Sequence, residues 1–114
     1  MTIREDLTER MRADLGFQPG LIEKRMFGGI CFLLHGNMLA LISDKTAMYR
    51  VGKDHEAEAC TLEGVEPMIH GKRKMGGFVH LDPAAFAELD DTRQPLTDLA
   101  LRHVTTLPPK AEQG

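Results

Sequence analysis

The sequence predicts an α+β domain: an antiparallel sheet of 4–5 strands with an N-terminal helix and C-terminal helices. Three observations lead to this fold class. Segments with helical periodicity stand near the two ends of the chain, short β-rich runs follow one another in its middle, and tight polar turns separate those runs. Strands grouped together, with helices before and after them, favour helices packed on one face of an antiparallel sheet.

The first helix is predicted over residues 3–15. Thr2 and Glu5 have the spacing of a capping box, in which each side chain bonds a free backbone N–H at the helix start. Apolar residues then recur every four positions, at Ile3, Leu7, Met11 and Leu15. Gly16 suits the residue just after a helix, and Pro19-Gly20 predicts a turn.

A meander of three strands is predicted next, over residues 30–34, 38–43 and 47–51, with turns at 35–37 and 44–46. The mixed segment 21–27 is assigned no strand. The strands at 30–34 and 38–43 alternate only weakly between apolar and polar residues, so we expect both faces of the sheet to be covered. Because helices cover one face, a second copy of the chain is the simplest cover for the other, and we expect a homodimer.

The second half of the chain predicts a short helix over residues 53–60, an irregular stretch over 61–67, a turn at Gly71 and a strand over 77–81. Asp82 followed by Pro83 marks a helix start, and Asp90-Asp91-Thr92 is expected to end that helix. The last helix is predicted to begin near Pro95 and to end before Pro108-Pro109. Its apolar side comprises Leu96, Leu99, Ala100, His103, Val104 and Leu107.

The bulk properties are those of one ordinary globular domain, expected over residues 1–109 with a frayed polar tail at 110–114. The net charge of −3 argues against a dedicated nucleic-acid binder, which needs a basic face. No apolar run could span a membrane and no apolar targeting segment precedes the first helix. We therefore expect a cytoplasmic protein whose two cysteines, Cys31 and Cys60, are free thiols.

The segment Arg25-Met26-Phe27-Gly28-Gly29 invites comparison with a phosphate-binding loop. It lacks the spacing of the known glycine-rich loops, and it leads into a strand rather than a helix. We predict a strand entrance in which Gly28 and Gly29 supply backbone freedom, Met26 and Phe27 pack against the first helix, and Arg25 stays near the surface. Gly76-Gly77 receives the same interpretation.

Few side chains in the sequence are candidates for ligand binding or catalysis. Lys72, Arg73 and Lys74 form the only basic run and are a candidate interaction patch for a phosphate backbone or an acidic partner; a solvated loop is the alternative. The histidines have no metal-binding spacing. Ser43 lacks a nucleophile elbow, Cys31 is expected to be buried, and Asp90-Asp91 suits a turn. The sequence thus predicts no catalytic, cofactor-binding or metal-binding residue.

Several segments together carry a family resemblance. Residues 25–29 before an apolar strand, the hairpin 35–42, the strand 48–51 and the segments 66–68 and 74–81 resemble the N-terminal domain of the TfoX/Sxy family over roughly residues 5–109. The resemblance implies an α+β fold similar to type III secretion chaperones, often dimeric. It also implies a role in regulating bacterial natural competence alongside a cAMP-receptor-type transcription factor. Because the chain ends at Gly114, we expect a stand-alone N-terminal domain.

Three functional hypotheses follow. The first is a non-enzymatic regulatory module, homodimeric, that acts on a protein partner such as a transcription factor. The second is a nucleic-acid-associated regulator using Arg25 and Lys72 to Lys74. The third is a small-molecule binder or unrecognised enzyme, for which Cys60, His55 and His70 are the available polar groups.

Overall fold

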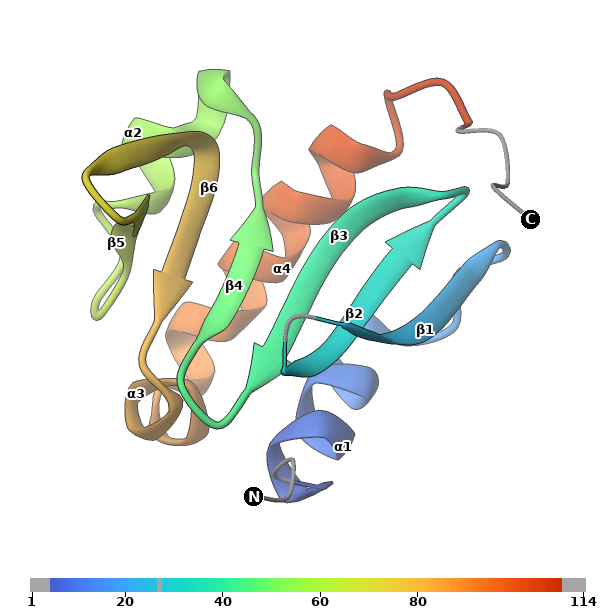
Figure 1. Ribbon diagram of the computed structural model, residues 1–114, viewed down its shortest axis with the longest axis horizontal. Coiled ribbons are helices and arrows are strands. Elements are labelled where there is room, and N and C mark those ends of the chain that lie inside the picture. Colours follow the sequence, from blue (N-terminus) through green and yellow to red (C-terminus); the bar gives the residue numbers. More distant parts are fainter. Residues whose placement is uncertain (1–4, 27, 110–114) are drawn as a thin grey trace.

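The computed structural model describes residues 5–26 and 28–109, and it has the predicted α+β architecture (Figure 1). The helices are α1 (Glu5–Leu15), the short 3-10 helix η1 (Lys53–His55), α2 (Glu56–Ala59), α3 (Pro83–Glu88) and α4 (Asp90–Val104). The strands are β1 (Leu21–Met26), β2 (Gly29–Leu34), β3 (Asn37–Ser43), β4 (Ala47–Arg50), β5 (Glu66–His70) and β6 (Arg73–Leu81).

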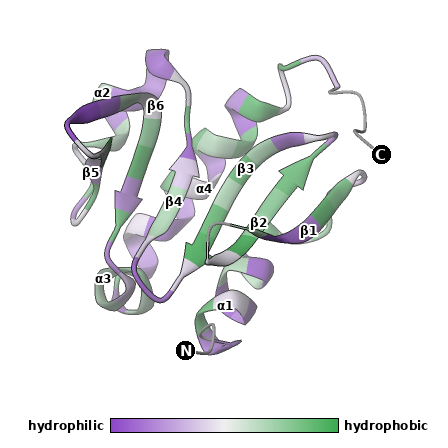
Figure 2. Ribbon diagram, in the orientation of Figure 1, coloured by the Kyte–Doolittle hydropathy of each residue, from purple (hydrophilic) through white to green (hydrophobic). Residues whose placement is uncertain are grey.

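The strands form one antiparallel sheet in the order β1-β2-β3-β4-β6-β5. The predicted meander corresponds to β2, β3 and β4. The sheet has six strands rather than 4–5 because β1 and β5 also pair, one at each edge. Edge strands carry charges or proline rather than continuous apolar residues, as Glu23, Lys24 and Arg25 do in β1 and Pro67 does in β5. Figure 2 shows this contrast between β1 and the more hydrophobic β2 and β3.

The helices pack on one face of the sheet and enclose the main core. From α1 the buried residues include Leu7, Met11 and Leu15, as the periodicity predicts, and the strands contribute large side chains such as Phe32 and Tyr49. The predicted apolar side of the last helix is also confirmed, with Leu96, Leu99, Ala100 and Val104 buried. Thr2 and Ile3 of the predicted capping box and first turn lie outside the described residues. No described helix is long and apolar enough to cross a membrane.

The boundary between the last two helices differs from the prediction. Asp82 caps α3 as expected, because its Oδ1 accepts a hydrogen bond of 2.9 Å from the Ala85 N–H. Asp90-Asp91-Thr92, however, opens α4 instead of forming a break, and only Leu89 separates the helices. Pro95 therefore lies inside α4. Two aspartates in a first turn interact favourably with the helix dipole, which accounts for the earlier start.

Arg93 joins the three larger helices from a buried position. Its Nε donates to Asp14 Oδ2 on α1 at 2.7 Å, and its guanidinium also bonds the Phe86 carbonyl oxygen at 2.8 Å and pairs with Asp90 at 2.8 Å. Burial alone would lower the pKa of Arg93, but the hydrogen bond to Asp14 and the nearby carboxylates raise the pKa overall. A buried cation needs such complete pairing, so Arg93 fixes how α1, α3 and α4 meet.

A methionine-lined groove on the helix-free face

The face of the sheet opposite the helices carries a second apolar cluster. Its centre is a cross-strand row in which Cys31 of β2 pairs with Leu41 of β3, and Leu41 pairs with Met48 of β4. These three side chains are buried, although no helix covers them. Half-buried apolar side chains surround the row and shield it: Met26, Leu33, Met38, Met68 and Phe78.

A β-bulge in β3 selects which side chains reach this face. Phe32 pairs with Ala40, but the next residue, Leu33, pairs with Met38, so Leu39 is an extra residue on β3. The bulge reverses the alternation of side chains between the two faces of the strand. Met38 and Leu41 therefore share the helix-free face, whereas Leu39 lies in the main core.

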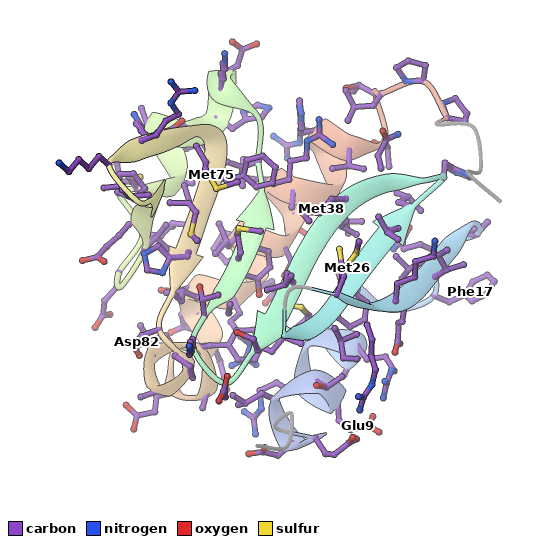
Figure 3. All side chains as sticks on the ribbon, viewed as in Figure 1. Glu9, Phe17, Met26, Met38, Met75 and Asp82 are labelled. Atoms are coloured by element: carbon purple, nitrogen blue, oxygen red, sulfur yellow. The ribbon has the colours of Figure 1, made fainter. Side chains whose placement is uncertain are left out.

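Methionine is concentrated on this face. The chain has seven methionines. Four belong to the second cluster or pack against it (Met26, Met38, Met48 and Met68), and Met75 lies nearby on β6 (Figure 3). Met11 is the exception among the described residues, because it lies in the main core. Unbranched, polarizable thioethers adapt to different neighbours, and surfaces rich in methionine suit partners of varied shape.

The β5–β6 hairpin turns this face into a groove. Pro67 of β5 pairs with Val79 of β6, and Ile69 pairs with Lys74. Between these two pairs β5 advances by two residues and β6 by five, so the extra residues make β6 bulge. Figure 1 shows the start of β6 arching beside the end of β4. The resulting groove has a volume of about 1020 Å³. Its lining is mainly apolar and includes Met38, Leu41, Met48, Met68, Ile69, Met75 and Phe78.

Glu56 of α2 holds the bulged part of the hairpin in place. Its Oε1 accepts a hydrogen bond from the Gly77 N–H at 2.9 Å, and its Oε2 pairs with Lys74 Nζ at 2.6 Å. Lys74 and, secondarily, the Gly77 N–H lower the pKa of Glu56. The Gly77 carbonyl oxygen in turn accepts from the N–H groups of Val51 and Gly52. Gly77 has φ +87°, and a side chain there would press on the Gly52 backbone. The backbone freedom predicted for Gly76-Gly77 is used at Gly77, but the predicted strand entrance is wrong: β6 begins at Arg73, so the two glycines lie inside the strand, at its bulge.

The edge of the groove is basic. Lys45, Arg73 and Lys74 line it, from the β3–β4 turn and from the start of β6. Arg50 lies on the same face, with its guanidinium carbon 5.8 Å from the centre of the Phe78 ring. Two polar atoms in the lining, Thr46 Oγ1 and His80 Nδ1, are buried without a hydrogen-bond partner in the described part of the chain.

The comparisons with known proteins give one match. A sequence model of the TfoX N-terminal domain matches residues 15–104, most of the chain. The chain belongs to the TfoX N-terminal domain family. This confirms the resemblance carried by the sequence motifs. No curated protein and no solved structure matches the chain.

In this TfoX N-terminal domain Gly28 and Gly29 stand at the entrance of β2, as predicted, whereas Arg25 and Met26 end β1. Gly28 has φ +75°, and Gly29 opens β2, where a side chain would collide with the Ile42 carbonyl oxygen. Arg25 is exposed, as predicted. The prediction for Met26 is wrong: Met26 packs on the helix-free face, because β1 alternates and its neighbour Arg25 faces the other way. Phe27 lies outside the described residues.

The predicted basic patch divides in two. Lys72 is exposed in the turn of the hairpin and does not line the groove, whereas Arg73 and Lys74 do. Arg25, which the nucleic-acid hypothesis combines with this patch, lies on β1, at the edge of the sheet opposite the hairpin. The structure therefore does not bring Arg25 together with Lys72 to Lys74.

The candidate nucleophiles of the TfoX N-terminal domain, Cys31, Cys60 and Ser43, lie in surroundings that serve the fold rather than in a reactive site. Burial raises the pKa of the Cys31 thiol to about 11, and burial also raises the pKa of Cys60. Both thiols are free. Ser43 Oγ accepts hydrogen bonds from the N–H groups of Lys45 and Thr46 and so stabilises the β3–β4 turn. His103 is half-buried, and burial lowers its pKa. The described residues contain no cluster of three or more potential metal ligands.

Sequence reasoning missed Glu56, Arg93 and the groove. Glu56 lay in a segment predicted to be helical, but its partners on β6 are 18 and 21 positions away. Arg93 follows the predicted break at 90–92 and precedes the predicted helix start near Pro95, so no role was predicted for it. The available signal for the groove was the number of methionines, which the bulge and the hairpin gather on one face.

Proposed function

We propose that this domain is a non-enzymatic protein-interaction module with a regulatory role, acting as a co-regulator of transcription in the bacterial cytoplasm. The groove is the observation that supports the proposal. It is an apolar concave surface on a sheet face without helices, and Ile69 at its edge is 58% exposed. Large exposed apolar residues beside a groove are typical of binding surfaces. The regulatory part rests on what the resemblance to the TfoX/Sxy family implies.

The chemistry of the lining favours binding over catalysis. Most of the surface of the groove lining is apolar, and its thioether and aliphatic side chains bind apolar surface without transferring protons. Cys31, which pairs with Leu41 of the lining, is buried with a raised pKa, which makes it a weak nucleophile. We therefore assign the groove to the apolar side chains of a protein partner.

A second copy of the chain fits the groove less well than a different partner. In a symmetric pairing of groove on groove, the same residues of the two copies lie near the symmetry axis and face one another. Arg73 and Lys45 of one copy would then approach the basic residues of the other. The sequence predicts a homodimer in which a second copy covers this helix-free face. That homodimer stays a prediction, and the present proposal places its interface outside the groove. Size-exclusion chromatography with light scattering tests it directly, and Ile69→Asp should leave the oligomeric state unchanged.

Comparative capture tests the proposed function. We expect wild type and Phe17→Asp to capture the same protein from the native host, and Ile69→Asp to lose it. Phe17 is the matched control, because it is 90% exposed and lies far from the groove (Figure 3). In a strain lacking the gene, wild type and Phe17→Asp should restore the affected transcripts, and Ile69→Asp should not. Equal capture and equal restoration by all three proteins would refute the proposal.

A further inference from the structure

The basic residues around the groove differ in how they are paired. Lys74 is engaged by Glu56 at 2.6 Å. Lys45 and Arg73 are exposed and form no ion pair with another described residue, although both line the groove. An unpaired cation next to an apolar surface is poised to meet a carboxylate on a bound molecule.

These cations stand at two ends of the apolar floor. Lys45 lies in the turn before β4, whose first residue Ala47 pairs with Leu81 at the end of β6. Arg73 is the first residue of β6, where the hairpin arches away (Figure 1). The methionines, Leu41 and Phe78 lie between these two ends. The groove therefore presents a basic group, an apolar floor and another basic group in series.

We propose, on the basis of the proposed function, that the groove binds a segment of a partner protein in which large apolar side chains are flanked on both sides by aspartate or glutamate. The apolar side chains lie on the methionine floor, whose thioethers adjust to their shape. The flanking carboxylates pair with Lys45 at one end and with Arg73 at the other.

The composition of the groove distinguishes this partner from a nucleic acid. Single strands bind by stacking bases on aromatic rings. Phe78 and His80 are the aromatic residues in the groove lining, and Arg50 lies over the Phe78 ring. The apolar floor is otherwise aliphatic or thioether, which gives bases no further ring on which to stack. The methionine floor and the basic ends together match an amphipathic acidic peptide better.

Selection from a library of random 12-residue peptides tests the proposal. The full chain is the target, and Ile69→Asp is the counter-target that removes groove binders. We expect selected peptides with Leu, Ile, Phe or Met flanked by Asp or Glu. Binding should weaken about tenfold in the double variant Lys45→Glu/Arg73→Glu. Lys72→Glu is the matched control, because Lys72 adjoins Arg73 but does not line the groove, and it should change affinity less than about twofold.

The first of three outcomes separates this inference from the proposed function. In that outcome the selected peptides bind the wild type but not Ile69→Asp, show no excess of Asp or Glu, and bind the double variant as tightly as the wild type. This result would overturn the present inference and leave the proposed function standing. Failure to recover any peptide sensitive to Ile69→Asp would overturn both. Groove-dependent binding of single-stranded DNA or of anionic lipid vesicles, in place of peptides, would also overturn both. Met75→Asp, a second change in the lining, repeats the test if Ile69→Asp is found to unfold by circular dichroism.

Discussion

The two faces of the sheet are built from the same strands but packed differently. Against the helices, branched and aromatic side chains such as Leu39, Phe32 and Tyr49 are almost completely buried. On the other face the buried row is short, and half-buried methionines surround it. The first face is fixed by its fit to α1 and α4. The second is shielded by flexible side chains that a bound molecule can displace. The comparison indicates that the helix-covered face specifies the fold, and the helix-free face is the one that we propose for binding.

Two leucines of β3 are expected to show the largest difference in stability between the two faces. Leu39 is 0% exposed on the helix-covered face, and Leu41 is 3% exposed on the helix-free face. Leu39→Ala should lower the free energy of unfolding by about 2–5 kcal/mol, since the helices leave a cavity unfilled. Leu41→Ala should cost about 1–2 kcal/mol, because neighbouring methionines can move into the space. Urea unfolding measures both, and equal costs would refute the claim that the helix-free face is more adaptable.

Gly28 and Gly29, where β1 passes into β2, extend the comparison to one corner of the helix-free face. A side chain at Gly29 would collide with the Ile42 carbonyl oxygen, and backbone cannot move aside as a methionine can. Gly29→Ala should therefore destabilise the domain by about 1–3 kcal/mol. Gly28 has open space around it, so Gly28→Ala should cost about 1 kcal/mol, which comes from its positive φ alone. Thermal unfolding of the two variants measures the difference, and the reverse order would contradict it.

Glu56 supports the wall of the groove and gives a smaller, pH-dependent effect. Its pKa is lowered in the folded state, so its contribution is present above the unfolded pKa of about 4.3 and is lost as pH falls through the folded pKa. Glu56→Gln should cost about 1 kcal/mol at pH 7, where the charged acceptor for the Gly77 N–H is lost. As pH falls through the folded pKa, the wild type also becomes neutral at this position, and the difference should shrink. Urea unfolding at pH 7 and at a series of lower pH values measures it; a gap that grows on acidification would contradict the assignment.

Periodicity and turn chemistry were sufficient to predict much of the fold. The apolar spacing in α1 and α4, the Asp82 cap and the meander from β2 to β4 are all local patterns. The edge strands β1 and β5 were not predicted, because their residues are charged or include Pro67. An edge strand pairs with only one neighbour and needs few apolar residues, so its sequence shows little apolar alternation.

The groove could not be predicted because it depends on distant contacts. The extra residue Leu39 decides which face Met38 occupies, and a bulge has no reliable local signature. The position of the hairpin depends on bonds from Glu56 to Lys74 and Gly77, which are far along the chain. The packing of Met26 was assigned to the wrong face for a related reason: without β1 as a strand, its alternation was not visible.

The methionine methyl groups give the most direct test of the central claim that the helix-free face binds a partner and the helix-covered face does not. In the chain with isotopically labelled methionine methyl groups, NMR follows Met38, Met48, Met68 and Met75 in the groove and Met11 in the main core. On addition of a peptide selected as above, we predict shifts for the four groove methyl groups and none for Met11. A shift of Met11 with the groove methyl groups unchanged would contradict the account.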